Sequence, residues 1–508
     1  MDSRNFLERI ISVLDAMKRF FVSLFPFCHP LLFAIHPVLS LWGSYANSIE
    51  ISQIIRPLVL SPLVAMFLLF LINLVVRDWF KASLICSLAI ILFFAEEPLI
   101  RTIISILELG GLGRRRILLP ALAVTYGLWV WWVVFRAKSL KRLTNIFVIM
   151  SIAVLTLSGI SIVLNLFENT STNIYAEDFK NVKLDKQGRL PNIYYIVVDS
   201  YARSDALLDL GYDNSQFIQF LKSRHFYVAE NSTSNYSSTN WSIDSTFNMQ
   251  YLNPQSHGRS SVFLQMISTS QIYHLLKELG YEFIIFDSPS IEKLGESDTD
   301  LFLSGQGSWI NLRLNLFEKK LLNNVILPGG IVYPGVIRNS VLYTLENLAR
   351  PVKMDGKYFV FAHIYCPHPP YVFGPDGKKV ADSSPVQISE QIKGYTEQVQ
   401  YLNSRLEVII DEILKQSDPV PIIILQGDHG HRIKDTDGAS LSKPVLLNLF
   451  ANLNAFYLPE RSDQSLYASI SNVNTFRVIL DEYFNAHLGL LPDENYLLLN
   501  NIFVGVST

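Results

Sequence analysis

Four short segments, far apart in the chain, carry side chains whose types and spacing could do chemistry. Together they supply two carboxylates, two or three imidazoles and a hydroxyl. Such a set can bind a divalent metal that activates an oxygen nucleophile. The segments are Val198-Asp199-Ser200, Thr239-Asn240-Trp241-Ser242, His363 to His368, and Gly427-Asp428-His429-Gly430.

Three of these segments follow apolar runs that predict buried strands, at residues 192–198, 358–364 and 421–426. Their nearly continuous apolar, β-branched sequence is typical of strands that are covered on both faces. In sheets built from such strands, ligands bind beyond the carboxyl ends of the strands. We therefore expect the first, third and fourth segments to converge at one edge of a sheet.

Segments with helical spacing, at residues 214–226, 269–279 and 388–414, alternate with these strands and with a further strand at 281–286. This alternation predicts an α/β domain with a mainly parallel sheet that is flanked by helices. We expect this catalytic domain at residues 191–508, after a polar linker at residues 168–190.

Residues 1–167 predict an all-α transmembrane bundle of about five helices. In the whole chain 49% of residues are hydrophobic and only 17% are charged, and the apolar excess lies in the first third. A run of about 20 apolar residues can cross a hydrocarbon core. The expected spans are Phe20 to Trp42, Pro57 to Val76, Trp79 to Ala95, Ile117 to Phe135 and Ile146 to Phe167.

The basic residues between these spans favour a cytoplasmic N-terminus and an extracytoplasmic catalytic domain. Ten Lys and Arg residues fall in segments that this topology places inside, and five fall outside. The cluster Arg114 to Arg116 is the exception, and it either binds anionic lipid headgroups or forms a solvated loop end. We expect a multi-pass protein of the plasma (inner) membrane.

The net charge of −3 gives no reason to expect a nucleic-acid partner. Cys366 is the only cysteine beyond the apolar N-terminal segments, so the catalytic domain is expected to fold without an internal disulfide. Because Cys366 lies inside the third segment, a reactive thiol is conceivable, but a small packed side chain is the favoured interpretation.

Each site residue has a local structural alternative. A carboxylate at the end of an apolar strand, as at Asp199, is costly unless it is paired or bound to metal, and the alternative is a helix N-cap. The glycines beside Asp428 and His429 allow a tight turn that aims both side chains at one point, and the alternative is a polar surface turn. His431 either contacts substrate or is simply exposed.

Thr239 precedes a helical stretch, where a hydroxyl is usually only a cap. Its functional interpretation is a nucleophile at a helix N-terminus, which favours a developing alkoxide and an anionic ester. His363 and His368 leave a buried strand beside stiffening prolines, and they are placed to protonate a leaving group or to clamp a phosphoryl oxygen.

The ordered set of these motifs resembles the alkaline phosphatase/sulfatase superfamily over roughly residues 190–490. The segments Asn454 to Pro459 and Asn472 to Arg477 also look like the C-terminal end of membrane-bound sulfatase-like proteins. Five spans followed by such a domain resemble the lipoteichoic acid synthases and the lipid A phosphoethanolamine transferases. The resemblance implies an alkaline-phosphatase-like fold.

In those families a threonine attacks a phospholipid headgroup ester, forms a phospho-threonine and hands the group to an acceptor. The resemblance therefore implies that Thr239 is the nucleophile, and that His363 and His368 face the substrate. It also implies membrane lipids and a lipid-linked or glycan acceptor as partners. The implied cofactor is one divalent metal, which is zinc, manganese or magnesium with calcium as a further option, and the implied ligands are Asp199, Thr239, Asp428 and His429.

Two departures bear on the reaction. Asp199 stands where the transferases have Glu, and Ser200 replaces a second Asp that is common in arylsulfatases. Arylsulfatases need an oxidised Cys or Ser where this chain has Thr239, and a threonine cannot supply that aldehyde. We therefore expect phosphoryl-group transfer or phosphodiester hydrolysis on cell-envelope or lipid-linked esters. The alternatives are a sulfuric ester or phosphoester hydrolase, and a catalytically inactive membrane scaffold or sensor.

Overall fold

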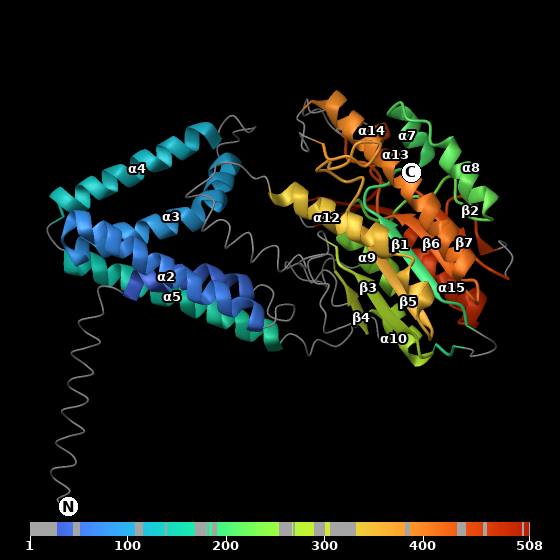
Figure 1. Ribbon diagram of the computed structural model, residues 1–508, viewed down its shortest axis with the longest axis horizontal. Coiled ribbons are helices and arrows are strands. Elements are labelled where there is room, and N and C mark those ends of the chain that lie inside the picture. Colours follow the sequence, from blue (N-terminus) through green and yellow to red (C-terminus); the bar gives the residue numbers. More distant parts are fainter. Residues whose placement is uncertain are drawn as a thin grey trace, which may run out of the picture. The chain divides into compact units, whose positions relative to one another are not determined.

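The structure is a computed structural model of the full chain (Figure 1). The described helices up to residue 167 form one compact unit, and the described elements from residue 179 onward form a second. The structure describes residues 28–43, 51–106, 115–137, 140–167, 179, 182–184, 190–252, 267, 270–288, 300–304, 332–380, 387–433, 443–460, 465–499 and 502–506.

The first unit is all-α in its described part, as the sequence predicts. Its helices are Cys28–Gly43, α2 (Ile51–Val76), α3 (Trp79–Ile106), α4 (Arg115–Phe135) and α5 (Leu140–Phe167). Two helical segments, Ile54–Val76 and Leu140–Leu164, are long and apolar enough to cross a membrane, and the apolar parts of the other three helices are shorter. The start of the predicted span Phe20 to Trp42, before residue 28, lies outside the described residues.

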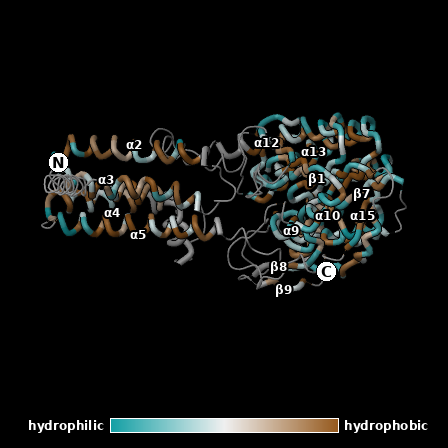
Figure 2. The backbone as a smooth tube through the Cα atoms, turned by 90° about the horizontal axis from the view of Figure 1, so that it is seen from below, coloured by the Kyte–Doolittle hydropathy of each residue, from teal (hydrophilic) through white to brown (hydrophobic). Residues whose placement is uncertain are grey.

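These helices are mainly hydrophobic along their length (Figure 2). Many of their large apolar side chains are exposed, whereas several small polar ones are buried. Phe67 is 64% exposed and Val75 is 83% exposed. Inside the unit, the ring of His29 hydrogen-bonds to Ser87 over 2.6 Å. An apolar exterior is stable in hydrocarbon rather than in water, so this unit has the surface of a membrane protein.

A seven-stranded sheet forms the centre of the second unit, with the strand order β2-β7-β6-β1-β5-β3-β4. Strands β6, β1, β5, β3 and β4 are parallel to one another, whereas β7 is antiparallel to β6 and to β2. The bounds are β1 Ile193–Val198, β2 Tyr227–Val228, β3 Glu282–Phe286, β4 Leu301–Leu303, β5 Tyr358–Ile364, β6 Ile422–Gly427 and β7 Asn454–Tyr457. A separate hairpin pairs β8 (Asn495–Leu499) with β9 (Ile502–Val506).

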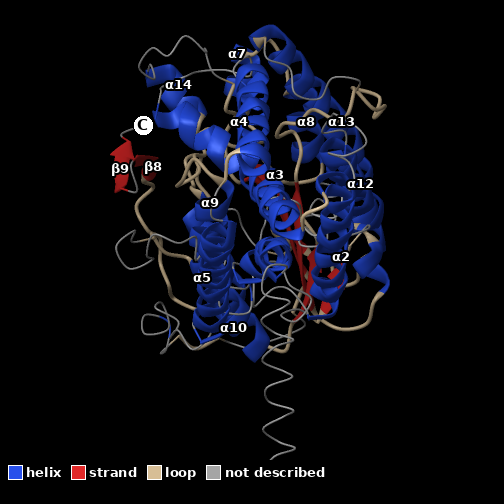
Figure 3. Ribbon diagram, turned by 90° about the vertical axis from the view of Figure 1, so that its left-hand side faces the viewer, coloured by secondary structure: helices blue, strands red, loops and turns tan. Residues whose placement is uncertain are grey.

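Helices cover both faces of the sheet (Figure 3), with α12 and α13 on one side and α9 and α10 on the other. The alternation along β1 shows why its sequence is apolar throughout: Tyr194 packs in the first layer and Tyr195 in the second, both fully buried. The helices are α7 Ser204–Asp209, α8 Ser215–Ser223, α9 Thr239–Asn248, α10 Gln271–Glu278, α12 Val332–Asn347, α13 Ile388–Gln416, α14 Lys443–Asn448 and α15 Thr475–Phe484.

The predicted fold class is therefore confirmed, since a mainly parallel sheet is flanked by helices and follows an all-α part. The structure differs from the prediction in the two edge strands of the sheet and in the start of one helix. Strands β2 and β4 have two and three residues, which is too short for a recognisable apolar pattern. Helix α9 begins at Thr239 itself, whereas the sequence predicted that Thr239 precedes the helix, because the first turn is polar and carries no apolar periodicity.

Candidate metal centre and active site

The strand register brings the predicted site segments to one edge of the sheet. Val198 on β1 pairs with Ile364 on β5 and with Gly427 on β6. Asp199 and Asp428 each follow one of these paired residues directly, so both leave the sheet at the same level. His363 is paired with Val197, one residue earlier, and still lies within β5.

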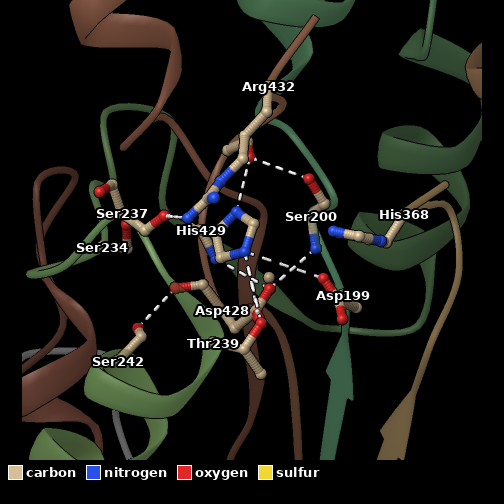
Figure 4. A network of polar contacts seen from close by, with 12 residues as sticks. Asp199, Ser200, Ser234, Ser237, Thr239, Ser242, His368, Asp428, His429 and Arg432 are labelled. Carbon is tan, nitrogen blue, oxygen red and sulfur yellow. Dashed lines mark hydrogen bonds and ion pairs between the residues drawn. The ribbon is translucent and has the colours of Figure 1, made fainter. Parts of the chain in front are cut away.

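Asp199, His363, Asp428 and His429 form a group that we call the central cluster (Figure 4 shows three of them). His363 Nε2 lies 3.6 Å from Asp199 Oδ2 and 3.8 Å from Asp428 Oδ2. His429 Nε2 lies 3.8 Å from Asp199 Oδ1 and 3.6 Å from Asp428 Oδ2. Each of the four residues is at most 1% exposed. Two carboxylates and two imidazoles thus face a shared, buried point.

The tautomer of His429 is set by its own backbone. Its Nδ1 donates a hydrogen bond of 2.8 Å to the carbonyl oxygen of Gly430, which can only accept. Burial lowers the pKa of His429 to about 4, although the nearby Asp428 carboxylate opposes that change. The ring is therefore neutral near pH 7, and Nε2 presents a lone pair to the two carboxylates.

Neighbouring groups also keep the carboxyl group of Asp428 ionised. Burial acts to raise the pKa of Asp428, but the imidazoles of His429 and His363 and the amide of Ser200 lower it more, so the carboxyl stays ionised. Its Oδ1 accepts hydrogen bonds from the amides of Ser200 (2.8 Å) and His429 (2.9 Å). Its Oδ2 accepts none and faces the two imidazoles.

Such a donor set fits a divalent cation. Asp199, His363 and Asp428 each offer a ligand atom, and these atoms all lie within 4.8 Å of one another. Buried negative charge costs several kcal/mol per ion unless it is compensated, and a bound cation would compensate both carboxylates at once. Carboxylate oxygen and imidazole nitrogen are also the ligands that zinc and similar metals take in proteins.

Thr239 is the first residue of α9, and its Oγ1 lies 3.4 Å from His429 Nε2. The N-cap of this helix is Ser238, and no side chain caps it. The hydroxyl of Thr239 therefore points to the central cluster rather than serving as a cap. Asp199 is likewise no cap, because the next helix, α7, has its N-cap at Arg203.

The glycines of the fourth segment are needed for close approach. A Cβ atom at Gly427 would overlap the carbonyl oxygen of Tyr201, and one at Gly430 would overlap that of Asn448. Neither glycine has the positive φ that a tight turn of the predicted kind would require, whereas Ser200 does, with φ 65°. Glycine thus lets neighbouring backbone pack directly against this segment.

Several residues that support the central cluster were not assigned from the sequence. Ser288 Oγ lies 2.7 Å from His363 Nδ1 and orients that ring. Ser242 donates a 2.5 Å hydrogen bond to the carbonyl oxygen of Asp428, and Asn472 donates to Ser242 over 3.2 Å. Ser288 could have been found, because it lies two residues after the predicted strand at 281–286, near the same edge of the sheet as Asp199.

His368 and His431 lie outside the central cluster. His368 is partly exposed, and its Nδ1 donates a 2.5 Å hydrogen bond to the carbonyl oxygen of Pro369. His431 is 4% exposed, so its predicted alternative, simple exposure, is not what the structure shows. Neither of its ring nitrogens has a hydrogen-bond partner, and burial lowers its pKa to about 4.

Two further side chains near the site differ in exposure. Arg432, which the sequence did not single out, is exposed and donates to the carbonyl oxygen of Ser237 near Thr239 (Figure 4). Cys366 is fully buried, and burial raises the pKa of its thiol well above the ordinary value. A thiol in that environment is packed and protonated, which agrees with the interpretation of Cys366 as a small packed residue.

Comparison with known proteins gives the family. The sulfatase family matches residues 191–476, more than half of the 508-residue chain. The protein belongs to this family, and the resemblance to the alkaline phosphatase/sulfatase superfamily is confirmed. No curated protein matches the sequence.

Solved structures of similar fold come from transferases and from sulfatases. The C-terminal periplasmic domain of EcEptC from Escherichia coli has a TM-score of 0.44 and 12% identity, over 64% of this chain and 95% of that one. The soluble domain of lipooligosaccharide phosphoethanolamine transferase A from Neisseria meningitidis has a TM-score of 0.39 and 12% identity, over 59% and 90%. BT1596, a 2-O GAG sulfatase, has a TM-score of 0.39 and 10% identity, over 60% and 73%.

Proposed function

We propose that this protein is a metal-dependent membrane phosphotransferase or phosphodiesterase that acts through Thr239 on cell-envelope or lipid-linked esters. The observation that carries this proposal is the position of the Thr239 hydroxyl, 3.4 Å from His429 Nε2 at the rim of a buried cluster of two carboxylates and two imidazoles. An alcohol is a weak nucleophile unless its pKa is lowered, and a cation bound at the central cluster would lower the pKa of the Thr239 hydroxyl.

The metal ligands would be Asp199, Asp428 and His429 together with Thr239, and the position of His363 Nε2 between the carboxylates adds it to that set. A bound divalent cation would lower the pKa of the coordinated hydroxyl and neutralise charge on the ester. Zinc, manganese and magnesium fit this donor set, and calcium remains a further option.

The chain's own residues would carry the transfer. Thr239 Oγ1 loses its proton to solvent and attacks the phosphorus atom, and the ester bond to the leaving oxygen breaks. An acceptor hydroxyl then loses its proton, bonds to phosphorus and breaks the bond to Thr239 Oγ1. The first turn of α9 offers amide donors to the anionic group, because four N–H groups at a helix start have no intrahelical partner. His368, at the partly exposed rim, is placed to give the leaving oxygen its proton.

We place the reaction at a membrane. The outward apolar faces of α2 and α5 support a multi-pass protein of the plasma (inner) membrane, with residues 191–508 on the extracytoplasmic side after a linker at 168–190. Membrane lipids would then serve as donors, and a lipid-linked or glycan molecule would be the acceptor. In this proposal, His431 contacts the substrate.

The second candidate is hydrolysis of sulfate or phosphate esters with water as the acceptor, which membership of the sulfatase family favours. Thr239 argues against the sulfate branch, because threonine cannot be oxidised to the aldehyde that such sulfatases use. The inactive scaffold predicts that no metal binds and that Thr239→Ala changes nothing.

Intact-mass spectrometry of the metal-loaded, full-length protein after incubation with phospholipid extract tests the proposal. We expect a mass increment that maps to Thr239 and that Thr239→Ala abolishes. Thr396→Ala is the matched control, because the Thr396 hydroxyl bonds within its own helix α13. A folded, metal-loaded protein that forms no adduct and cleaves no ester would rule out the enzyme.

A further inference from the structure

A cavity of about 650 Å³ lies in the second unit, away from the central cluster. This volume is in the range of small-molecule sites, roughly 300–1,000 Å³. Helix α9 has 10 residues and begins at Thr239, and the cavity is lined just beyond its other end, so about 15 Å of helix separates the two sites. The polar lining residues are Gln250, Tyr251, Arg477 and His487, and apolar ones include Phe179 and Leu491.

Arg477 on α15 is the unusual residue of this cavity. It is only 8% exposed, and its Nε has no hydrogen-bond partner in the part of the chain that the structure describes. Nη1 makes one long contact of 3.4 Å to the carbonyl oxygen of Leu488. Among the residues that the structure describes, no carboxylate forms an ion pair with this guanidinium within 4.0 Å. A buried, uncompensated charge is costly, and burial accordingly lowers the pKa of Arg477.

The nearest candidate counter-ion on the same helix, Asp481, is already engaged. Residues four apart on a helix are neighbours, so an Arg477–Asp481 pair would be the ordinary solution. Instead, Asp481 accepts hydrogen bonds from the amides of Leu488 (2.6 Å) and Gly489 (2.8 Å), which fold the following loop back onto α15. The carboxylate of Asp481 is therefore bound by loop amides, and the guanidinium of Arg477 lines the cavity without it.

We propose that this cavity is an anion site, in which Arg477 binds a phosphate or carboxylate oxyanion. A guanidinium presents five donors in a planar fork that matches such oxyanions, and here Nε has no partner among the described residues. The apolar side chains of Phe179, Val182, Leu488 and Leu491 line the same cavity. The oxyanion can thus come from the headgroup of an amphiphile or from a free ion, and neither source depends on the proposed reaction at Thr239.

Isothermal titration calorimetry on the full-length protein in non-ionic detergent with EDTA tests this site. EDTA keeps the central cluster free of metal, so it does not contribute metal-bound phosphate. The two probes are dihexanoyl phosphatidic acid and inorganic phosphate. We expect one saturable site per chain for at least one probe, and Arg477→Gln should weaken it by at least about tenfold, as expected for the loss of a charge-assisted hydrogen bond.

Two further variants make the outcome decisive. Gln250→Glu places a carboxylate in the cavity while Arg477 stays in place, and it should weaken binding by a similar factor. Arg224→Gln removes an exposed arginine that pairs with Asp411, and it should leave binding unchanged. Tighter binding of phosphatidic acid than of phosphate identifies a headgroup, and equal binding identifies a free oxyanion. Failure of both probes to bind, or unchanged binding in both cavity variants, overturns the proposal.

Discussion

The described part of the α/β unit buries carboxylates at several places, and two of these, the central cluster and helix α9, shift the pKa of the carboxyl group in opposite directions. Asp428 in the central cluster faces two imidazoles and accepts two amide hydrogen bonds, and its pKa is lowered. Asp244, in the middle of α9, is 5% exposed and accepts a hydrogen bond from Asn248 (2.8 Å). Burial raises the pKa of Asp244 to about 7, although the Asn248 bond opposes that change.

The difference teaches that burial alone does not mark a metal ligand. No basic side chain in the described part of the chain pairs with Asp244, so this carboxyl avoids the cost of burial by holding its proton. In the central cluster, donors keep Asp428 ionised beside a second carboxylate, and a cation is the remaining way to balance the charge. Both acids lie close to Thr239 in sequence or in space, yet of the two only Asp428 belongs to a group of side chains that could hold a metal ion.

The largest effect that this comparison predicts is for Asp428→Asn. The variant should lose metal affinity by more than the roughly 100-fold that is typical of residues that only orient a ligand, because a charged ligand is removed. Calorimetric titration with zinc or manganese measures this change. In EDTA, the variant should be less stable to urea near pH 7 than the unsubstituted protein, because the lowered pKa of Asp428 means that its ionised form stabilises the folded state. Equal metal affinity in the two proteins would contradict the assignment of Asp428.

The second-largest effect is the change in stability caused by Asp244→Asn, and we expect this change to depend on pH. The native carboxyl titrates near 7 and the unfolded one near its ordinary value, 3.8. Between these values the native state binds more protons, so the contribution of Asp244 to stability is present at low pH and is lost as pH rises through 7. At pH 8 we expect the variant to be more stable by roughly 3–4 kcal/mol, and at pH 4 the gain should be small.

Urea unfolding of the full-length protein at pH 4, 6 and 8 measures that difference. Glu390→Gln, which replaces an exposed acid at the start of α13, serves as the matched control and should show no such trend. A difference between Asp244→Asn and the unsubstituted protein that does not vary with pH would mean that Asp244 is ionised in the native state.

The smallest effect is for Ser288→Ala, which keeps every metal ligand but removes the group 2.7 Å from His363 Nδ1. Loss of such an orienting partner typically costs about 10–100-fold in metal affinity. Calorimetry with the same metals measures it, and Ser304→Ala is the control, because Ser304 bonds to the neighbouring Asp287 instead. If the two serine variants bind metal alike, His363 is not a ligand whose orientation matters.

The sequence by itself determined the elements that lead to the site. Runs of apolar, β-branched residues are buried on both faces, so β1, β5 and β6 were predictable nearly to the residue, and polar residues directly after β1 and β6 had to leave the sheet at its carboxyl edge. The five helical segments of the first unit and the order of the four motifs were equally visible in the chain.

Only the tertiary structure decided which strands are neighbours and at what register. That choice puts His363 Nε2 between Asp199 and Asp428, brings Ser288 to its ring, and directs Thr239 to His429. The tertiary structure also bonds the Asp481 carboxylate to the amide of Leu488 in the following loop, so that Arg477 lines a cavity without this counter-ion. The physical reason is that such contacts join residues tens to hundreds of positions apart, and local sequence patterns carry no information about the distances between them.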